Sequence, residues 1–79
     1  MNIYKISRKG NVDYDEYDSF IISANSSQAV RKAAAKEASG EGSWTWKEPK
    51  NSIVQLIGQT TKSLKVTNGQ VLLASYNAG

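Results

Sequence analysis

The stretch FIISANSSQAVRKAAAKEASG, residues 20–40, decides the fold class because a strand period changes to a helix period within it. Its first part is apolar at every second position, as in a strand with one buried face: Phe20, Ile22 and Ala24. Its second part is apolar at the three- and four-residue spacing of one helix face: Val30, Ala33, Ala34 and Ala38. Ser26 is the expected N-cap, with Asn25 as a competitor. The stretch therefore predicts a strand followed by a helix over about 27–38.

Upstream of this unit, residues 2–8 alternate between apolar and polar side chains and predict a first strand. Residues 9–18 form a polar connection in which Gly10-Asn11 is the turn signal. The second strand is expected over 19–24, antiparallel to the first.

Downstream of the helix, residues 40–51 predict an irregular segment, and residues 52–58 predict a strand that is apolar on both faces. That pattern favours a central strand, or an interface on the side away from the helix. Asn68-Gly69 is the preferred dipeptide of a two-residue hairpin turn. Counting outward from it places four apolar residues on one face of the hairpin: Leu64, Val66, Val71 and Leu73.

These elements predict one α+β domain over residues 1–79, in the order β-β-α-β-β. We expect an antiparallel sheet of four to five strands, with one helix packed on one face and the last two strands forming the hairpin at Asn68-Gly69. The outer helix face then carries three basic residues together with Gln28 and Ala35: Arg31, Lys32 and Lys36. The order of the strands stays open.

Composition limits the chemistry available to the chain. The 79 residues include no cysteine and no histidine. Disulfides, zinc sites of the usual kind and thiol or Ser-His-Asp nucleophiles are therefore excluded. We expect no enzyme, no cofactor and no metal. No apolar run approaches the roughly 20 residues that span a membrane, and the N-terminus lacks a signal-peptide apolar region, so a cytoplasmic location in the host cell is expected.

Charge is distributed unevenly along the chain. The net charge is +3, yet four of the seven acidic residues lie within the segment DYDEYD, whose residues are Asp13, Tyr14, Asp15, Glu16, Tyr17 and Asp18. Such a segment can present charge to a basic protein surface, with the tyrosines as anchors of low conformational entropy. A hard cation or a merely solvated loop are the alternatives, although the spacing does not match a twelve-residue calcium loop. We predict a partner-binding role.

Trp44 and Trp46, which Lys47 follows, are the second candidate contact surface. They can serve as interface residues, as a stacking platform for single-stranded nucleic acid, or as core aromatics of a small domain. The basic helix face of Arg31, Lys32 and Lys36 is a candidate for phosphate contacts, with an ordinary solvated face as the alternative.

Three features of the chain resemble a set of very short phage and prophage proteins: the opening IYKISRK with YDEYDSFIISA, the Ile57-Gly58 step, and the ending VLLASYNAG. Those proteins share a strand-to-helix junction of the form A-x-S-x-x-x-A-R and a terminus close to S-F-N-A-G. In this chain the junction runs over residues 24–31 with Val30 in the place of the alanine, and Tyr76 replaces the phenylalanine. Most such proteins have no assigned activity, and some inhibit host defence, including anti-CRISPR proteins that bind a nuclease complex.

The resemblance implies a non-enzymatic binding protein that inhibits or modulates a host protein or nucleoprotein complex through protein-protein contact. The positive net charge departs from the strongly acidic inhibitors that mimic DNA. Two alternatives stay open. One is a small nucleic-acid-binding module that uses the basic helix face with the two tryptophans. The other is a self-associating accessory protein, with Ile53 and Ile57 on an uncovered sheet face.

Overall fold

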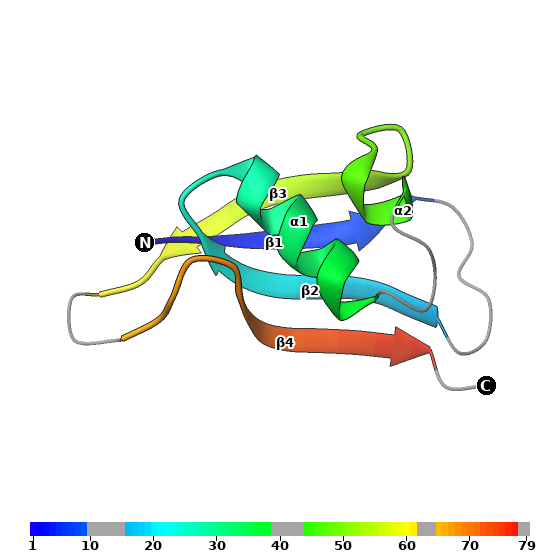
Figure 1. Cartoon of the computed structure of the whole chain (residues 1–79). Coiled ribbons are helices and arrows are strands. Elements are labelled where there is room, and N and C mark those ends of the chain that lie inside the picture. The colour runs from blue at the N-terminus through cyan, green and yellow to red at the C-terminus, as the bar shows by residue number, and fades with distance from the viewer. Residues whose placement is uncertain (10–15, 39–43, 62–64, 78–79) are drawn as a thin grey trace.

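Four antiparallel strands form a single sheet in the order β3-β1-β2-β4, and two helices cover one of its faces (Figure 1). The computed structural model describes residues 1–9, 16–38, 44–61 and 65–77. The elements follow one another as β1 (Asn2–Arg8), β2 (Glu16–Ala24), α1 (Ser27–Glu37), α2 (Trp44–Lys47), β3 (Ser52–Gln59) and β4 (Gln70–Asn77). The α+β class and the four-stranded antiparallel sheet are thus as predicted. The short helix α2 lies in the segment that the sequence predicts to be irregular.

The junction between β2 and α1 follows the local signals in the sequence. Ser26 has an extended backbone, with φ −156° and ψ 162°, and its Oγ accepts a hydrogen bond from Ala29 N. Ser26 is therefore the N-cap, as predicted, and it satisfies one of the amides that the first helical turn leaves unpaired. The helix ends at Glu37, after which Ala38 N donates to Ala34 O at 2.9 Å. The predicted stop at Gly40 lies outside the described residues.

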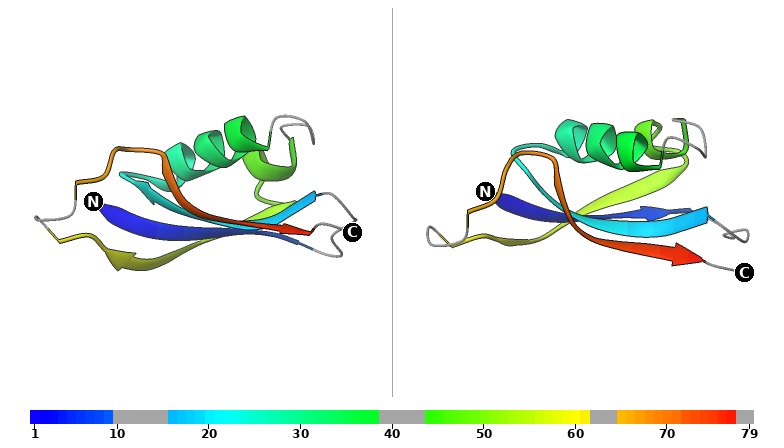
Figure 2. Two further views of the ribbon diagram at one scale, coloured as in Figure 1. Left: turned by 90° about the horizontal axis from the view of Figure 1, so that it is seen from below. Right: turned by 60° about the horizontal axis from the view of Figure 1, so that its bottom comes forward.

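The core lies between the helices and one face of the sheet, and no described element covers the opposite face (Figure 2). Its buried apolar residues come from both central strands and both helices: Ile6, Phe20, Ile22, Ala24, Val30, Ala34, Ala35, Ala38 and Trp46. The prediction that Ala35 faces solvent is wrong, because α2 lies along that flank of α1. Ala33, which was expected in the core, is only half-buried.

The pairing of β2 with β4 contains an extra residue that reorients the start of β2. Tyr17 lies opposite Tyr76, whereas Ser19 lies opposite Ser75, so Asp18 is the additional residue of a β-bulge. The bulge brings Tyr17 to the core face, where its ring centroid lies 4.9 Å from that of Phe20. The second strand therefore begins at Glu16, three residues earlier than predicted.

The predicted hairpin between the last two strands is wrong. β3 and β4 lie on opposite edges of the sheet, and β3 pairs with β1 whereas β4 pairs with β2 (Figure 1). The described residues 65–67 form no strand, and Leu64 lies outside the described residues. Of the two interpretations of this strand, the central position is wrong for the same reason, because β3 is an edge strand. The alternative, an interface on the side away from the helix, stays a prediction.

Asn68-Gly69 does form a turn, but the turn docks on the end of β2. Gln70 N donates to Thr67 O at 3.2 Å, and Gly69 has a φ of 82°. Gly69 N then donates to Ser23 O at 2.7 Å, and Ser23 Oγ donates to Thr67 O at 2.8 Å. The side chain of Asn68 adds a third link, since its Oδ1 accepts from Asn25 N at 2.9 Å. These bonds attach the turn to β2 and explain why Ser23 is fully buried.

Gly69→Ala is expected to lower the free energy of unfolding by roughly 1–2 kcal/mol, the cost of a left-handed φ for a residue with a Cβ. Space is not the cause, because an added Cβ would meet Ala33 Cβ at an ordinary 3.5 Å. Urea unfolding followed by circular dichroism measures the change. Gly58→Ala is the matched control: a Cβ there meets nothing within 4 Å, and we expect no loss of stability. Equal stability of the two variants would contradict the left-handed backbone conformation assigned to Gly69.

Candidate functional site

Only part of the acidic segment, residues 13–18, lies among the described residues. Residues 13–15 and the side chain of Glu16 lie outside the described residues. Tyr17 packs against the core, and Asp18 Oδ1 accepts a hydrogen bond from Ser19 Oγ at 3.1 Å. Tyr17 is therefore held by Phe20 and offers little free ring surface as an interface anchor. The partner-binding role of the remaining residues of this segment stays a prediction.

Trp46 belongs to the core, which is one of the three alternatives that the sequence allows. Its side chain is 0% exposed, and its ring meets Phe20 edge-to-face with centroids 5.0 Å apart. A base cannot stack on a ring without exposed surface, so Trp46 does not contribute to a contact surface. Trp44 begins α2, and its side chain lies outside the described part of the structure.

Both arginines of the chain hold the short helix α2 in place. Arg8 extends from the end of β1, and its guanidinium carbon lies 5.1 Å from the Trp46 ring centroid while Nε donates to Tyr17 O at 2.9 Å. Arg31 approaches from α1. Its Nη1 donates to Trp46 O at 3.2 Å and to Ser52 Oγ at 2.8 Å, and its Nη2 donates to Ser52 O at 3.1 Å. A guanidinium presents several N–H donors in one planar fork, so it can donate to several fixed oxygens at once.

Arg31 is consequently not part of a solvated basic face, although the sequence groups it with Lys32 and Lys36. It is half-buried and occupied by backbone and hydroxyl oxygens of α2 and β3. Lys32 and Lys36 are exposed, as predicted. The structure brings a third cation to them, Lys47 at the end of α2, which sequence spacing alone does not reveal.

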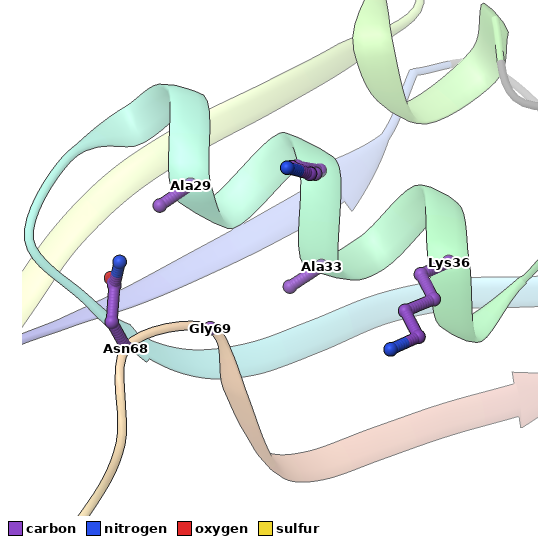
Figure 3. A pocket seen from close by; sticks show the side chains of 6 residues that line it. Ala29, Ala33, Lys36, Asn68 and Gly69 are labelled. Atoms are coloured by element: carbon purple, nitrogen blue, oxygen red, sulfur yellow. The ribbon is translucent and has the colours of Figure 1, made fainter.

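Hollows surround Lys32 on both flanks of α1. One of about 270 Å³ lies between α1 and the 68–69 turn, and its lining includes Lys32, Lys36 and Asn68. In Figure 3 the side chain of Lys36 extends from α1 toward β2 and β4, on the flank of α1 where the turn also lies. Two others of about 300 Å³ each lie toward α2: one is lined by Gln28, Arg31, Lys32 and Lys47, and the other by Lys32, Ala35, Lys36 and Lys47. None of the described residues in the three linings is acidic.

The edge strand β3 is the most apolar exposed element of the described structure. Ile53 is 46% exposed, Leu56 59% and Ile57 53%. The strand contains no charged residue and no proline over its whole length. Its pairing with β1 is regular from Ser52 to Leu56, beyond which Ile57 is an extra residue opposite the step from Ile3 to Tyr4. Most edge strands carry charges, proline or bulges that prevent pairing with another chain, and the regular part of β3 has none of these.

Other kinds of site find no support within the described ranges. No group of three or more acidic residues that could hold a metal ion occurs there. No described helix has the length and apolar character to cross a membrane. No protein-family model matches the chain, and neither the curated proteins nor the solved structures contain a significant match.

Proposed function

We propose that the chain is a non-enzymatic binding protein of phage or mobile-element type that modulates a host macromolecular complex by protein-protein contact. We further propose that the free edge of β3 makes this contact by accepting an extended strand of the partner. The observation that carries the proposal is an uncharged edge strand with three large apolar side chains exposed to solvent.

Strand addition accounts for the absence of charge on β3 and for the exposure of its large apolar side chains. The free backbone N–H and C=O groups of an edge supply main-chain hydrogen bonds to an incoming strand, and neighbouring side chains supply specificity. Ile53 and Ile57 then bury their exposed surface against the partner, each worth roughly 1–2 kcal/mol of apolar transfer. β4 is also uncharged, but its pairing with β2 is interrupted twice, whereas the pairing of β3 with β1 is regular over residues 52–56 and is interrupted only at Ile57. Bulges make an edge a poorer template, so β3 is the better candidate.

Ile57→Lys is expected to abolish partner capture while the melting temperature of the isolated protein changes little, because the side chain is exposed. A tagged chain is incubated with nuclease-treated host lysate, and the retained proteins are identified by mass spectrometry. Leu73→Lys is the matched control: Leu73 is also exposed and apolar, but it lies on the opposite edge.

The proposal requires a protein that the parent and Leu73→Lys retain and Ile57→Lys loses. If Ile57→Lys retains the same proteins as the parent, β3 is not the contact. Light scattering of the isolated chain tests the self-associating alternative: a dimer that Ile57→Lys converts to a monomer assigns the β3 edge to a second copy and overturns the proposed host contact.

A further inference from the structure

The side of the molecule that carries the helices has a concentration of exposed lysines. Lys32, Lys36 and Lys47 are all exposed, and none has a hydrogen-bond or ion-pair partner among the described residues. Lys32 and Lys36 stand one helical turn apart, which places their stems on the same face of α1. The nearby Arg31 adds a half-buried charge whose recorded acceptors are all neutral oxygens. An anion on this surface therefore meets several cations, and no described lining residue carries a carboxylate.

The lysines line three adjacent hollows on this surface. Lys32 lines all three of them, Lys36 lines two and Lys47 lines the two toward α2. Lysines that line adjacent depressions can each neutralise a different phosphate of a backbone. The amide side chains of Gln28 and Asn68 add hydrogen-bonding groups to two of the linings.

We propose that Lys32, Lys36 and Lys47 form a binding site for the phosphate backbone of a nucleic acid. Lysine ammonium groups neutralise phosphates as point charges and release condensed counterions, which is the main source of sequence-independent binding. The inference is independent of the proposed contact through β3.

Two described residues near this surface that could read a base sequence are not available for it. Trp46 has no exposed ring to stack on a base, and Arg31, whose fork could recognise guanine, is occupied by Trp46 O and Ser52. Phosphate contacts position a protein on nucleic acid without reading its sequence. We therefore infer backbone binding with no sequence preference.

A membrane surface fits the site less well. Helices that bind at the lipid interface combine basic residues with large apolar side chains that enter the acyl boundary. Among the described residues that line the three hollows, alanine is the only one with an apolar side chain. The exposed leucine and isoleucine residues lie on β3 and β4 instead.

The test is fluorescence anisotropy of the full chain with a labelled DNA duplex of about 20 base pairs, titrated between 50 and 200 mM salt. Three phosphate contacts predict a slope of log K against log salt of about −2.7, so affinity falls about 40-fold over this range. The double variant Lys32→Gln with Lys36→Gln is expected to reduce the slope by about 1.8 and to lower affinity at 50 mM salt by about tenfold or more. Lys47→Gln alone reduces the slope by about 0.9.

Lys5→Gln with Lys65→Gln is the matched control, because it removes the same charge from exposed positions outside α1 and α2. Its slope is expected to stay that of the parent. Equal losses in the two double variants would show that net charge alone binds the duplex and would overturn the site. Absence of binding at 50 mM salt, a preference among duplexes of different sequence, or binding to anionic phosphatidylserine vesicles in place of the duplex would each overturn the proposal as well.

Discussion

Trp46→Ala is expected to lower the free energy of unfolding by roughly 3–5 kcal/mol, the usual cost of deleting a buried aromatic side chain. Trp46 is the largest fully buried residue among those described, and it joins α2 to the aromatic cluster of the sheet through Phe20. A chain of 79 residues has a total stability of roughly 4–12 kcal/mol. The variant therefore loses a large part of its stability, and its melting temperature is expected to fall by roughly 12–40 °C.

Trp46→Phe is the informative companion variant. The indole Nε1 is buried without a hydrogen-bond partner among the described residues, and an unsatisfied buried donor is itself unfavourable. Phenylalanine removes this donor and keeps an aromatic ring against Phe20, so we expect a much smaller loss than with alanine. Urea unfolding monitored by circular dichroism compares the two variants. A Trp46→Ala protein that melts within a few degrees of the parent would show that this ring is not in the core.

Arg31→Ala is expected to lower the free energy of unfolding by roughly 2–3 kcal/mol, because hydrogen bonds from a charged group to buried oxygens are among the stronger ones. The variant loses all three bonds from Arg31 to α2 and the start of β3. The 3.5 Å hydrogen bond from Ser52 Oγ to Trp46 O is retained in this variant. Calorimetry or urea unfolding measures the change.

Lys32→Ala is the control for Arg31→Ala, since it stands next in the sequence, carries the same charge and is exposed without a described partner. We expect its stability to remain within about 0.5 kcal/mol of the parent. The two variants are also expected to change different quantities. Arg31→Ala lowers the free energy of unfolding, whereas Lys32→Ala lowers the affinity for DNA. If the two variants are equally stable, the three hydrogen bonds of Arg31 contribute nothing to stability, and Arg31 belongs to the solvated basic face that the sequence suggests.

The strand-to-helix unit could be predicted because its signals are local. The alternation over Phe20 to Ala24 and the capping hydroxyl of Ser26 each act within a few residues, and the structure has both as expected. The antiparallel pairing of β1 with β2 was predictable for a similar reason, since a short connection joins two neighbouring strands.

The predicted hairpin at Asn68-Gly69 shows what local signals in the sequence do not determine. Asn68-Gly69 makes a turn with a left-handed glycine, as its chemistry requires, yet the strand after it pairs with β2. A turn specifies a change of direction and leaves the choice of partner strand to long-range contacts. The bonds of the turn to Ser23 and Asn25 are such contacts, and they connect residues more than 40 positions apart.

The candidate sites depend even more on tertiary contacts. Arg31 and Lys32 look alike in the sequence, but only Arg31 reaches the carbonyl oxygens of α2 and β3. Lys47 joins the lysines of α1 only because α2 packs beside that helix. The apolar pattern of β3 was visible in the sequence, whereas its position at an edge was not.

The sequence by itself therefore determined the class of the fold, the strand-to-helix unit, the N-cap and the turn, because these follow from periodicity and backbone conformation over a few residues. Only the tertiary structure decided the strand order, the burial of Trp46, the role of Arg31 and the two candidate surfaces. The physical reason is that alanine-rich helices, uncharged strands and basic side chains each fit several environments. Which environment each one occupies depends on the residues that the fold brings beside it.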